Sequence, residues 1–198
     1  YNLNELKELM DIEGLRRGIY TDKYFLNTQD ILQELANGKH PALNDISSDG
    51  SSSVSDAVVE MQVFTRRPGK TIICGTNFAL ACLKFCTGYW ENESFVDKSS
   101  ELEVWSVDEG DTTVYTGDPA QVVPMMKIRG RYRDFAINET LILGYLSRAS
   151  RIATNMYQLL EAANGKSMLF FPARYDLPDV QTLDGYAYAT AIKAYNQR

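Results

Sequence analysis

The sequence predicts an α+β fold: an α/β domain with an antiparallel sheet, followed by the first strand and helix of an incomplete α/β domain. Three observations predict it. Apolar residues recur at helical spacing in several segments, and they alternate with a period of two over residues 101–132. A short apolar run at 167–171 precedes a helical pattern at 179–195, and a strand followed by a helix opens a parallel α/β arrangement.

Composition narrows the class of protein. The chain has 198 residues, 44% of them hydrophobic, and a net charge of −6. These values exclude collagen-like and disordered chains, and no apolar run reaches the roughly 18 residues that span a bilayer. The acidic balance argues against a nucleic-acid partner. Three cysteines, an odd number, favour a reducing compartment, so we expect a cytoplasmic protein.

The N-terminal region predicts helices and a loop. Residues 3–17 carry an amphipathic pattern that Gly18 closes, and Asn27-Thr28 is expected to cap a second helix that runs through Ala36 and stops at Gly38. The serine-rich segment 44–56 is too polar to pack and predicts a mobile loop.

The central region predicts mostly sheet. We expect strands at 58–64 and 71–74 joined by a turn at 67–69, then a helix from Thr76 to about Tyr89. Antiparallel strands with turns at 108–111 and 116–119 follow. From Asn138 a helical pattern runs to Asn164-Gly165, with a possible break near residues 147–150.

Few residues carry chemistry by themselves. Arg174 follows the expected strand at 168–171, at the strand end where α/β folds place ligands, and its guanidinium suits a carboxylate or phosphate. Phe171 offers a ring beside it. The alternatives are a surface arginine at position 174, and a loop aromatic folded onto the core at Tyr24. The basic run 129–133 suits an anion or a solvated strand end.

Metal and covalent chemistry find little support. Cys82 and Cys86 share a helix face, but no second pair or nearby histidine completes a site, so we expect no metal held by cysteine or histidine. His40, the only histidine, has no nucleophile at a suggestive spacing. Lys127 between apolar residues resembles the modified lysine of carrier domains, although it lacks their tight exposed turn.

Six segments, taken in order, resemble the nicotinate phosphoribosyltransferase family over residues 20–190. They are Thr21-Asp22-Lys23-Tyr24-Phe25, Leu102-Glu103-Val104-Trp105 with residues 108–111 behind it, Glu139-Thr140-Leu141-Ile142-Leu143-Gly144, Ser150-Arg151-Ile152-Ala153-Thr154, Leu169-Phe170-Phe171-Pro172-Ala173-Arg174 and Leu183-Asp184-Gly185-Tyr186.

The resemblance implies an α/β sandwich domain at residues 1–165 and the first β/α unit of an incomplete TIM-like barrel at 166–198. It implies a homodimer or higher homo-oligomer with active sites across the interface. It also implies transfer of phosphoribosyl from phosphoribosyl pyrophosphate to nicotinate in NAD biosynthesis, with Mg²⁺ and commonly with ATP. Catalysis of this kind needs positioning and charge stabilisation rather than a covalent residue.

The resemblance also implies residue roles. Tyr24 would come from the partner subunit to stack on the pyridine ring, and Phe171 would cover the opposite face. Arg174 would hold anionic groups, with Thr154 and Asp22 in support. Where the family often has a second arginine, this chain has Tyr175.

Other readings stay open. The base could be nicotinamide or quinolinate, and the chain could be a non-catalytic assembly or regulatory relative. Because it ends inside a helical pattern, we expect a fragment of a longer protein that is inactive alone, and an exposed strand edge at 168–171 predicts oligomers.

Overall fold

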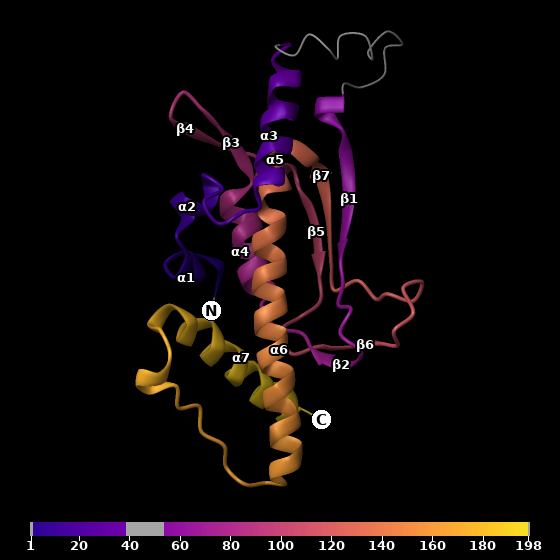
Figure 1. Ribbon diagram of the computed structural model, residues 1–198, viewed down its shortest axis with the longest axis vertical. Coiled ribbons are helices and arrows are strands. Elements are labelled where there is room, and N and C mark those ends of the chain that lie inside the picture. Colours follow the sequence, from indigo (N-terminus) through magenta and orange to yellow (C-terminus); the bar gives the residue numbers. More distant parts are fainter. Residues whose placement is uncertain (1, 39–53, 198) are drawn as a thin grey trace. The chain divides into compact units, whose positions relative to one another are not determined.

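The computed structural model describes residues 2–38 and 54–197 (Figure 1). The chain divides into two compact units. Unit 1 combines Tyr1–Met61, Leu80–Val104 and Lys127–Ile142, and unit 2 combines Gln62–Ala79, Trp105–Met126 and Leu143–Arg198. The chain therefore passes between the units several times. The predicted division between residues 165 and 166 stays a prediction.

The N-terminal helices of unit 1 differ from the prediction at their starts. The predicted helix at 3–17 is two helices, α1 (Leu3–Lys7) and α2 (Ile12–Arg16). The reason is a local cap, because Asp11 Oδ1 accepts from the Gly14 N–H at 3.0 Å and restarts the helix. Gly18 closes α2 with a φ of +68°, as predicted.

Helix α3 (Lys23–Ala36) has Asp22 as its N-cap rather than the predicted Asn27-Thr28, and it ends at Ala36 as predicted. Gly38 follows with a φ of +66°. The predicted loop at 44–56 and His40 lie largely outside the described residues, which resume at the 3₁₀ turn η2 (Val54–Asp56).

Unit 1 contains a hairpin that the pattern did not predict. Helix α4 (Thr76–Cys86) ends three residues earlier than expected, and β3 (Gly88–Glu91) then pairs antiparallel with β4 (Ser94–Asp97). The turn residues Asn92 and Glu93 have φ of 45° and 67°. Positive φ at both central residues is what the twist of a tight hairpin requires.

The larger sheet has the strand order β1–β7–β5, with most of its residues in unit 1. Its strands are β1 (Val58–Val63), β5 (Glu103–Ser106) and β7 (Met126–Arg131). Strand β7 leads into α5 (Tyr132–Phe135) and the turn η4 (Ala136–Asn138), and η3 (Ser99–Glu101) precedes β5.

Unit 2 contains the second antiparallel pair, β2 (Gly69–Ile72) and β6 (Thr112–Tyr115), in which Gly69 faces Tyr115 and Ile72 faces Thr112. Strands form on both sides of residues 67–69, as predicted, but they do not pair with each other: β1 joins β7 whereas β2 joins β6. Strand pairing depends on contacts that are distant in sequence, and the local turn signal at Pro68-Gly69 did not reveal them.

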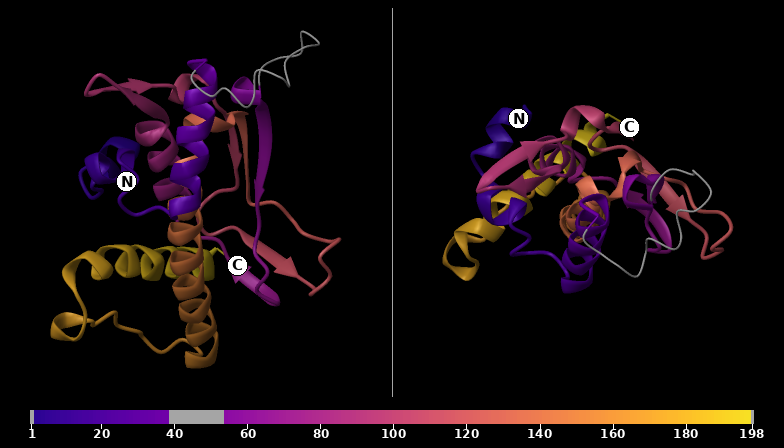
Figure 2. Two further views of the ribbon diagram at one scale, coloured as in Figure 1. Left: turned by 45° about the horizontal axis from the view of Figure 1, so that its top comes forward. Right: turned by 90° about the horizontal axis from the view of Figure 1, so that it is seen from above.

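The core of unit 2 lies between two long helices. Helix α6 (Glu139–Ala163) is continuous through Ser147–Ser150, and α7 (Pro178–Asn196) crosses it (Figure 2). Small side chains on both helices let them approach closely, and Ile72 and Cys74 at the end of β2 pack on the same cluster; its helical members are Ala149, Ala153, Met156, Tyr157, Ala187 and Ala191.

The predicted barrel strand at 167–171 is absent, since these residues pair with no strand in the part of the chain described. The segment instead lies on α7: the Tyr188 hydroxyl donates to the Met168 carbonyl at 2.6 Å, and the Phe170 ring lies 5.5 Å from that of Tyr188. Leu169 and Phe171 point away, 80% and 70% exposed. The continuous apolar run at 168–171 gave the strand-like pattern, and the described residues show an α+β fold without a barrel.

Candidate functional site

The start of α3 is fixed against the start of α6 in unit 1. The Thr140 hydroxyl donates to Asp22 Oδ2 at 3.0 Å and accepts from the Asp22 N–H at 3.2 Å. One residue earlier, the Thr21 hydroxyl donates to the Ile137 carbonyl at 2.7 Å. The two polar residues that open the Thr21–Phe25 motif therefore hold Tyr24 in a defined place.

Tyr24 presents its ring to the surface. The residue is 59% exposed, and its ring centroid lies 4.1 Å from that of buried Phe25. The helix behind it is anchored by Gln29, whose Nε2 donates to the carbonyls of Gly88 and Arg133 at 3.3 and 3.0 Å. An exposed ring on an anchored helix can stack on a flat ligand at a small entropic cost.

Two phenols and two carboxylates share one environment, which we call the acidic aromatic cluster: Asp22, Tyr24, Tyr132 and Glu139. Burial, then the charges of Asp22 and Glu139, raise the pKa of Tyr24. Burial, then Glu139 and Tyr24, raise the pKa of Tyr132. Burial, then Asp22, raises the pKa of Glu139. A cluster of this composition favours positive charge in a ligand placed against it.

The raised pKa of Glu139 gives a stability prediction. The folded state disfavours the charged form of Glu139. The free energy of unfolding therefore falls as pH rises from the unfolded pKa of Glu139, near 4.5, to its raised pKa in the folded protein. Glu139→Gln is therefore expected to match the wild type near pH 3.5 and to be the more stable protein at pH 7, in urea melts at both values. Glu34→Gln, an exposed change on α3, is the control and should show no such gain. A constant offset at both pH values would contradict the assignment.

Phe171 and Arg174 lie together on the exposed segment of unit 2 that precedes α7. Arg174 Nη2 donates to the Tyr175 hydroxyl at 3.3 Å, and its guanidinium carbon lies 5.1 Å from that ring. The turn η5 (Ala173–Tyr175) is held by Gln181, whose Nε2 donates to the carbonyls of Ala173 and Asp176 at 2.8 and 2.7 Å. Tyr175, which replaces an expected arginine, thus supports the one that is present.

Thr154 lies in the core of unit 2. Its hydroxyl accepts from the Ile72 N–H at 2.9 Å and donates to the Ser150 carbonyl at 2.6 Å, and the residue is 2% exposed. The side chain therefore fixes β2 on α6. Tyr24 and Asp22 are brought together in unit 1, and Phe171 and Arg174 in unit 2. A sandwich of residues 24 and 171 across two subunits stays a prediction.

Some polar residues at these positions had no sequence signal of their own. Tyr132 and Glu139 join Tyr24 only through folding. In unit 2, the Arg148 guanidinium donates twice to the nearly buried Asp184 carboxylate, at 2.9 Å each. Asp184 belongs to one of the six recognised segments, and the preceding long helix offers Arg148 and Arg151 as basic partners, of which the fold selects Arg148.

A metal-binding role finds no geometric support in the described residues: among 2–38 and 54–197, no three His, Cys, Asp or Glu side chains gather as a metal site. Cys82 is buried, with its thiol 3.7 Å from Asn138 Oδ1, and Cys86 is buried as well. Lys127 lies within β7, 3.8 Å from Glu60, rather than at an exposed turn. Over the same ranges no helix is both long and apolar enough to cross a bilayer.

Comparison with known proteins places these features in a family. A sequence model described as quinolinate phosphoribosyl transferase, N-terminal domain, matches residues 30–150. Among solved structures, a nicotinate-nucleotide pyrophosphorylase from Pyrococcus furiosus is 25% identical with a TM-score of 0.63, over 90% of this chain and 38% of that one.

Two further structures show a similar fold. NadC from Streptococcus pyogenes is 17% identical with a TM-score of 0.51, over 83% of this chain and 51% of its own. Human nicotinic acid phosphoribosyltransferase is 19% identical with a TM-score of 0.53, over 86% of this chain and 34% of its own. The chain therefore spans between about a third and a half of the structures that it matches.

Proposed function

Because the chain belongs to the quinolinate phosphoribosyl transferase N-terminal domain family, we propose that it forms the N-terminal part of an enzyme that makes nicotinate mononucleotide. The reaction takes phosphoribosyl pyrophosphate and a pyridine carboxylate and releases pyrophosphate. The observation that carries the proposal is the family match over residues 30–150, which reaches Tyr132 and Glu139 of the acidic aromatic cluster. The matches to a nicotinate-nucleotide pyrophosphorylase and to a nicotinic acid phosphoribosyltransferase support it.

Quinolinate is the base that the family match favours. In that reaction the ring nitrogen bonds to C1 of the ribose, the bond from C1 to pyrophosphate breaks, and the 2-carboxylate leaves as CO₂. The electron pair left on the ring carbon takes a proton. Nicotinate, the second candidate, has no 2-carboxylate and releases no CO₂; the six recognised segments and the human structure favour it.

The residues of this chain suit charge stabilisation. Transfer of the ribosyl group develops positive charge on the sugar and then on the pyridinium ring of the product. In our proposal Tyr24 stacks on that ring from one subunit, and Asp22 and Glu139 place negative charge near it. Phe171 covers the other face, and Arg174 holds an anionic group of the phosphoribosyl ligand.

The implied Mg²⁺ does not fit a site formed by the described residues alone, since they bring no three metal-ligating side chains together. We therefore assign no step to a metal held by this chain. Dimerisation, ATP and Mg²⁺ stay predictions from the family resemblance.

A complementation experiment tests the proposal on the gene product that contains this chain. Tyr24→Ala and Arg174→Ala are each expected to lower kcat/KM for phosphoribosyl pyrophosphate by about 10- to 30-fold, because each active site loses one contact worth roughly 1.5–2 kcal/mol. If each site takes Tyr24 from one subunit and Arg174 from the other, unfolding and refolding the two variants together restores up to about a quarter of wild-type activity, because some mixed dimers hold one intact site.

The assay also separates the candidate bases. Quinolinate labelled at its 2-carboxylate should release labelled CO₂ together with nicotinate mononucleotide, whereas use of nicotinate gives the mononucleotide alone. Leu159→Ala, an exposed change on α6, serves as the matched control and should leave activity unchanged. The 198-residue chain by itself is expected to be inert. No mononucleotide from either base with the whole gene product would favour a non-catalytic assembly module.

A further inference from the structure

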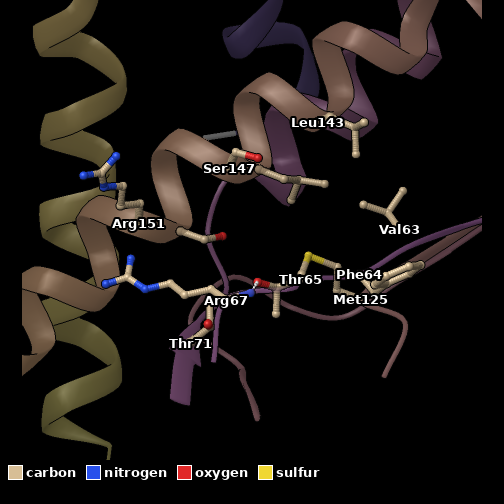
Figure 3. Close-up of a pocket in the computed structure, with 11 residues that line it drawn as sticks. Val63, Phe64, Thr65, Arg67, Thr71, Met125, Leu143, Ser147 and Arg151 are labelled. Atoms are coloured by element: carbon tan, nitrogen blue, oxygen red, sulfur yellow. Dashed lines mark hydrogen bonds between the residues drawn. The ribbon is translucent and has the colours of Figure 1, made fainter. Parts of the chain in front are cut away.

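Unit 2 contains a cavity of about 270 Å³ that the proposed reaction does not use. It lies between the β1–β2 connection and α6, and all of its lining residues belong to unit 2 (Figure 3). Figure 3 shows one polar end, with Arg67, Thr71 and Arg151, and one apolar end, with Val63, Phe64 and Met125. A cavity with one polar end and one apolar end selects an amphipathic ligand.

The polar end is built by helical spacing. Ser147, Arg151 and Asn155 follow one another at intervals of four on α6, so they share one face of the helix. Asn155 Oδ1 accepts from Arg67 Nη2 at 2.9 Å and brings that guanidinium from the β1–β2 connection to the same face. In Figure 3 the side chains of Arg67 and Arg151 extend to the same side, away from Val63 and Phe64.

These two cations are uncompensated. Neither Arg67 nor Arg151 forms an ion pair with a carboxylate in the portion of the chain that the structure describes, although the sequence carries a net charge of −6. Two unpaired guanidinium groups on one face gain from an anion placed between them, because planar guanidinium groups match carboxylate and phosphate oxygens.

Thr71 provides an independent sign of a ligand. The residue lines the cavity and is 2% exposed, and its Oγ1 has no hydrogen-bond partner among the described residues. A buried hydroxyl without a partner costs about 1–3 kcal/mol, so such groups are rare in folded proteins. A ligand oxygen in the cavity would supply the missing acceptor.

We propose that this cavity binds a small organic anion. Its carboxylate or phosphate group lies between Arg67 and Arg151 and accepts from Thr71, and its apolar body lies against Val63, Phe64 and Met125. The volume limits its size: at about 30 Å³ for each water-sized group, roughly nine non-hydrogen atoms fit, which is the size of benzoate. The inference stands on unit 2 alone and does not depend on the proposed reaction.

Calorimetric titration of the 198-residue chain with benzoate, phenyl phosphate and inorganic phosphate tests the proposal. We expect saturable one-to-one binding of at least one aromatic anion, more tightly than inorganic phosphate. Stronger binding of benzoate identifies a carboxylate ligand, and stronger binding of phenyl phosphate identifies a phosphate ester. Binding of inorganic phosphate alone would overturn the proposal, because the apolar end would then have no role. The proposal would also be overturned if none of the probes bound at a millimolar concentration in 10-fold molar excess over the protein.

Two variants separate binding from folding. Thr71→Val keeps the shape of the side chain and removes a buried hydroxyl, so the urea midpoint should stay the same or rise while the Kd rises about tenfold. Arg151→Gln, at an exposed helix position, should raise the Kd at least tenfold. Lys166→Gln removes one exposed positive charge of unit 2 outside the cavity and should leave the Kd within twofold. Equal Kd values for all four proteins would overturn the site.

Discussion

Gly75→Ala is expected to lower the free energy of unfolding by between about 2 and 6 kcal/mol. Gly75 has a φ of +95°, where an alanine side chain adds about 1–3 kcal/mol of strain. A Cβ at this position would lie 2.7 Å from the Tyr145 carbonyl oxygen and 3.2 Å from the Ala149 Cβ, both on α6. Overpacking against a backbone that cannot yield adds about 1–3 kcal/mol more. Urea unfolding followed by circular dichroism measures the loss.

The same change disturbs a second contact. The Gly75 N–H donates to both carboxylate oxygens of Glu109, at 3.1 and 2.9 Å, and Glu109 also accepts from the Asn77 N–H at the start of α4. Moving residue 75 away from α6 therefore weakens this charged cap as well. The measured loss is expected in the upper part of the range for that reason.

Gly144→Ala is the matched control for the glycine prediction. Gly144 lies in α6, and a Cβ there would meet nothing within 4 Å. Alanine in place of glycine within a helix should raise stability by about 0.5–1 kcal/mol. If the free energy of unfolding falls in Gly75→Ala and rises in Gly144→Ala, the close approach of α6 at residue 75 is the reason that glycine is needed there. A Gly75→Ala protein as stable as the wild type would refute that geometry.

The features best predicted from sequence were those decided by a single residue. Gly18, Gly38 and Asn164-Gly165 were expected to end helices, and all have positive φ in the structure. A left-handed backbone is a local requirement that few residues satisfy, so the sequence shows it directly. The continuity of α6 through residues 147–150 was less evident, because the length of the helical pattern suggested a break there. Folding gives Ser150 a partner instead: its hydroxyl donates to the Cys74 carbonyl at 3.0 Å.

Features decided by distant contacts were not predictable in the same way. The β3–β4 hairpin was missed because its turn, Asn92-Glu93, lacks the glycine of the commonest tight turns, and Tyr89 and Trp90 continued an apolar pattern. The apolar run at 168–171 predicted a strand, whereas in the structure Met168 and Phe170 lie on α7, and Leu169 and Phe171 are exposed. Periodicity reports which side chains are buried and does not say what covers them.

The candidate sites also depend on contacts between residues that are distant in sequence. Tyr24 and Asp22 were found through a recognised motif, but their neighbours Tyr132 and Glu139 lie more than 100 residues further along the chain. Arg67 belongs to a predicted turn and Arg151 to a recognised segment, and only the fold brings them to one cavity. Pairing of charges across elements is decided by topology, which one sequence does not reveal.

Asp134→Asn is expected to lower the free energy of unfolding by about 3–5 kcal/mol, the usual loss when one partner of a buried ion pair is removed. Asp134 is 2% exposed, and its Oδ2 accepts from Arg131 Nε at 2.9 Å. Arg133 Nε lies 3.8 Å from its other oxygen, and the Arg133 side chain is only 11% exposed. An amide would present an N–H group to one of these guanidinium groups and leave positive charge in the interior of unit 1.

Asp134→Asn should also disturb the position of Tyr132 in the acidic aromatic cluster. Asp134 lies in the same short helix as Tyr132, whose ring packs edge-on against Phe135 at 5.8 Å. Glu103→Gln is the matched control, since Glu103 pairs with Arg129 at 3.1 Å with both side chains more than half exposed, and it should cost at most about 1 kcal/mol. Urea melts of both variants measure the difference. If the two losses were equal, Asp56, which lies 3.0 Å from Arg133 and 3.6 Å from Arg131, would be sufficient to balance both arginines without Asp134.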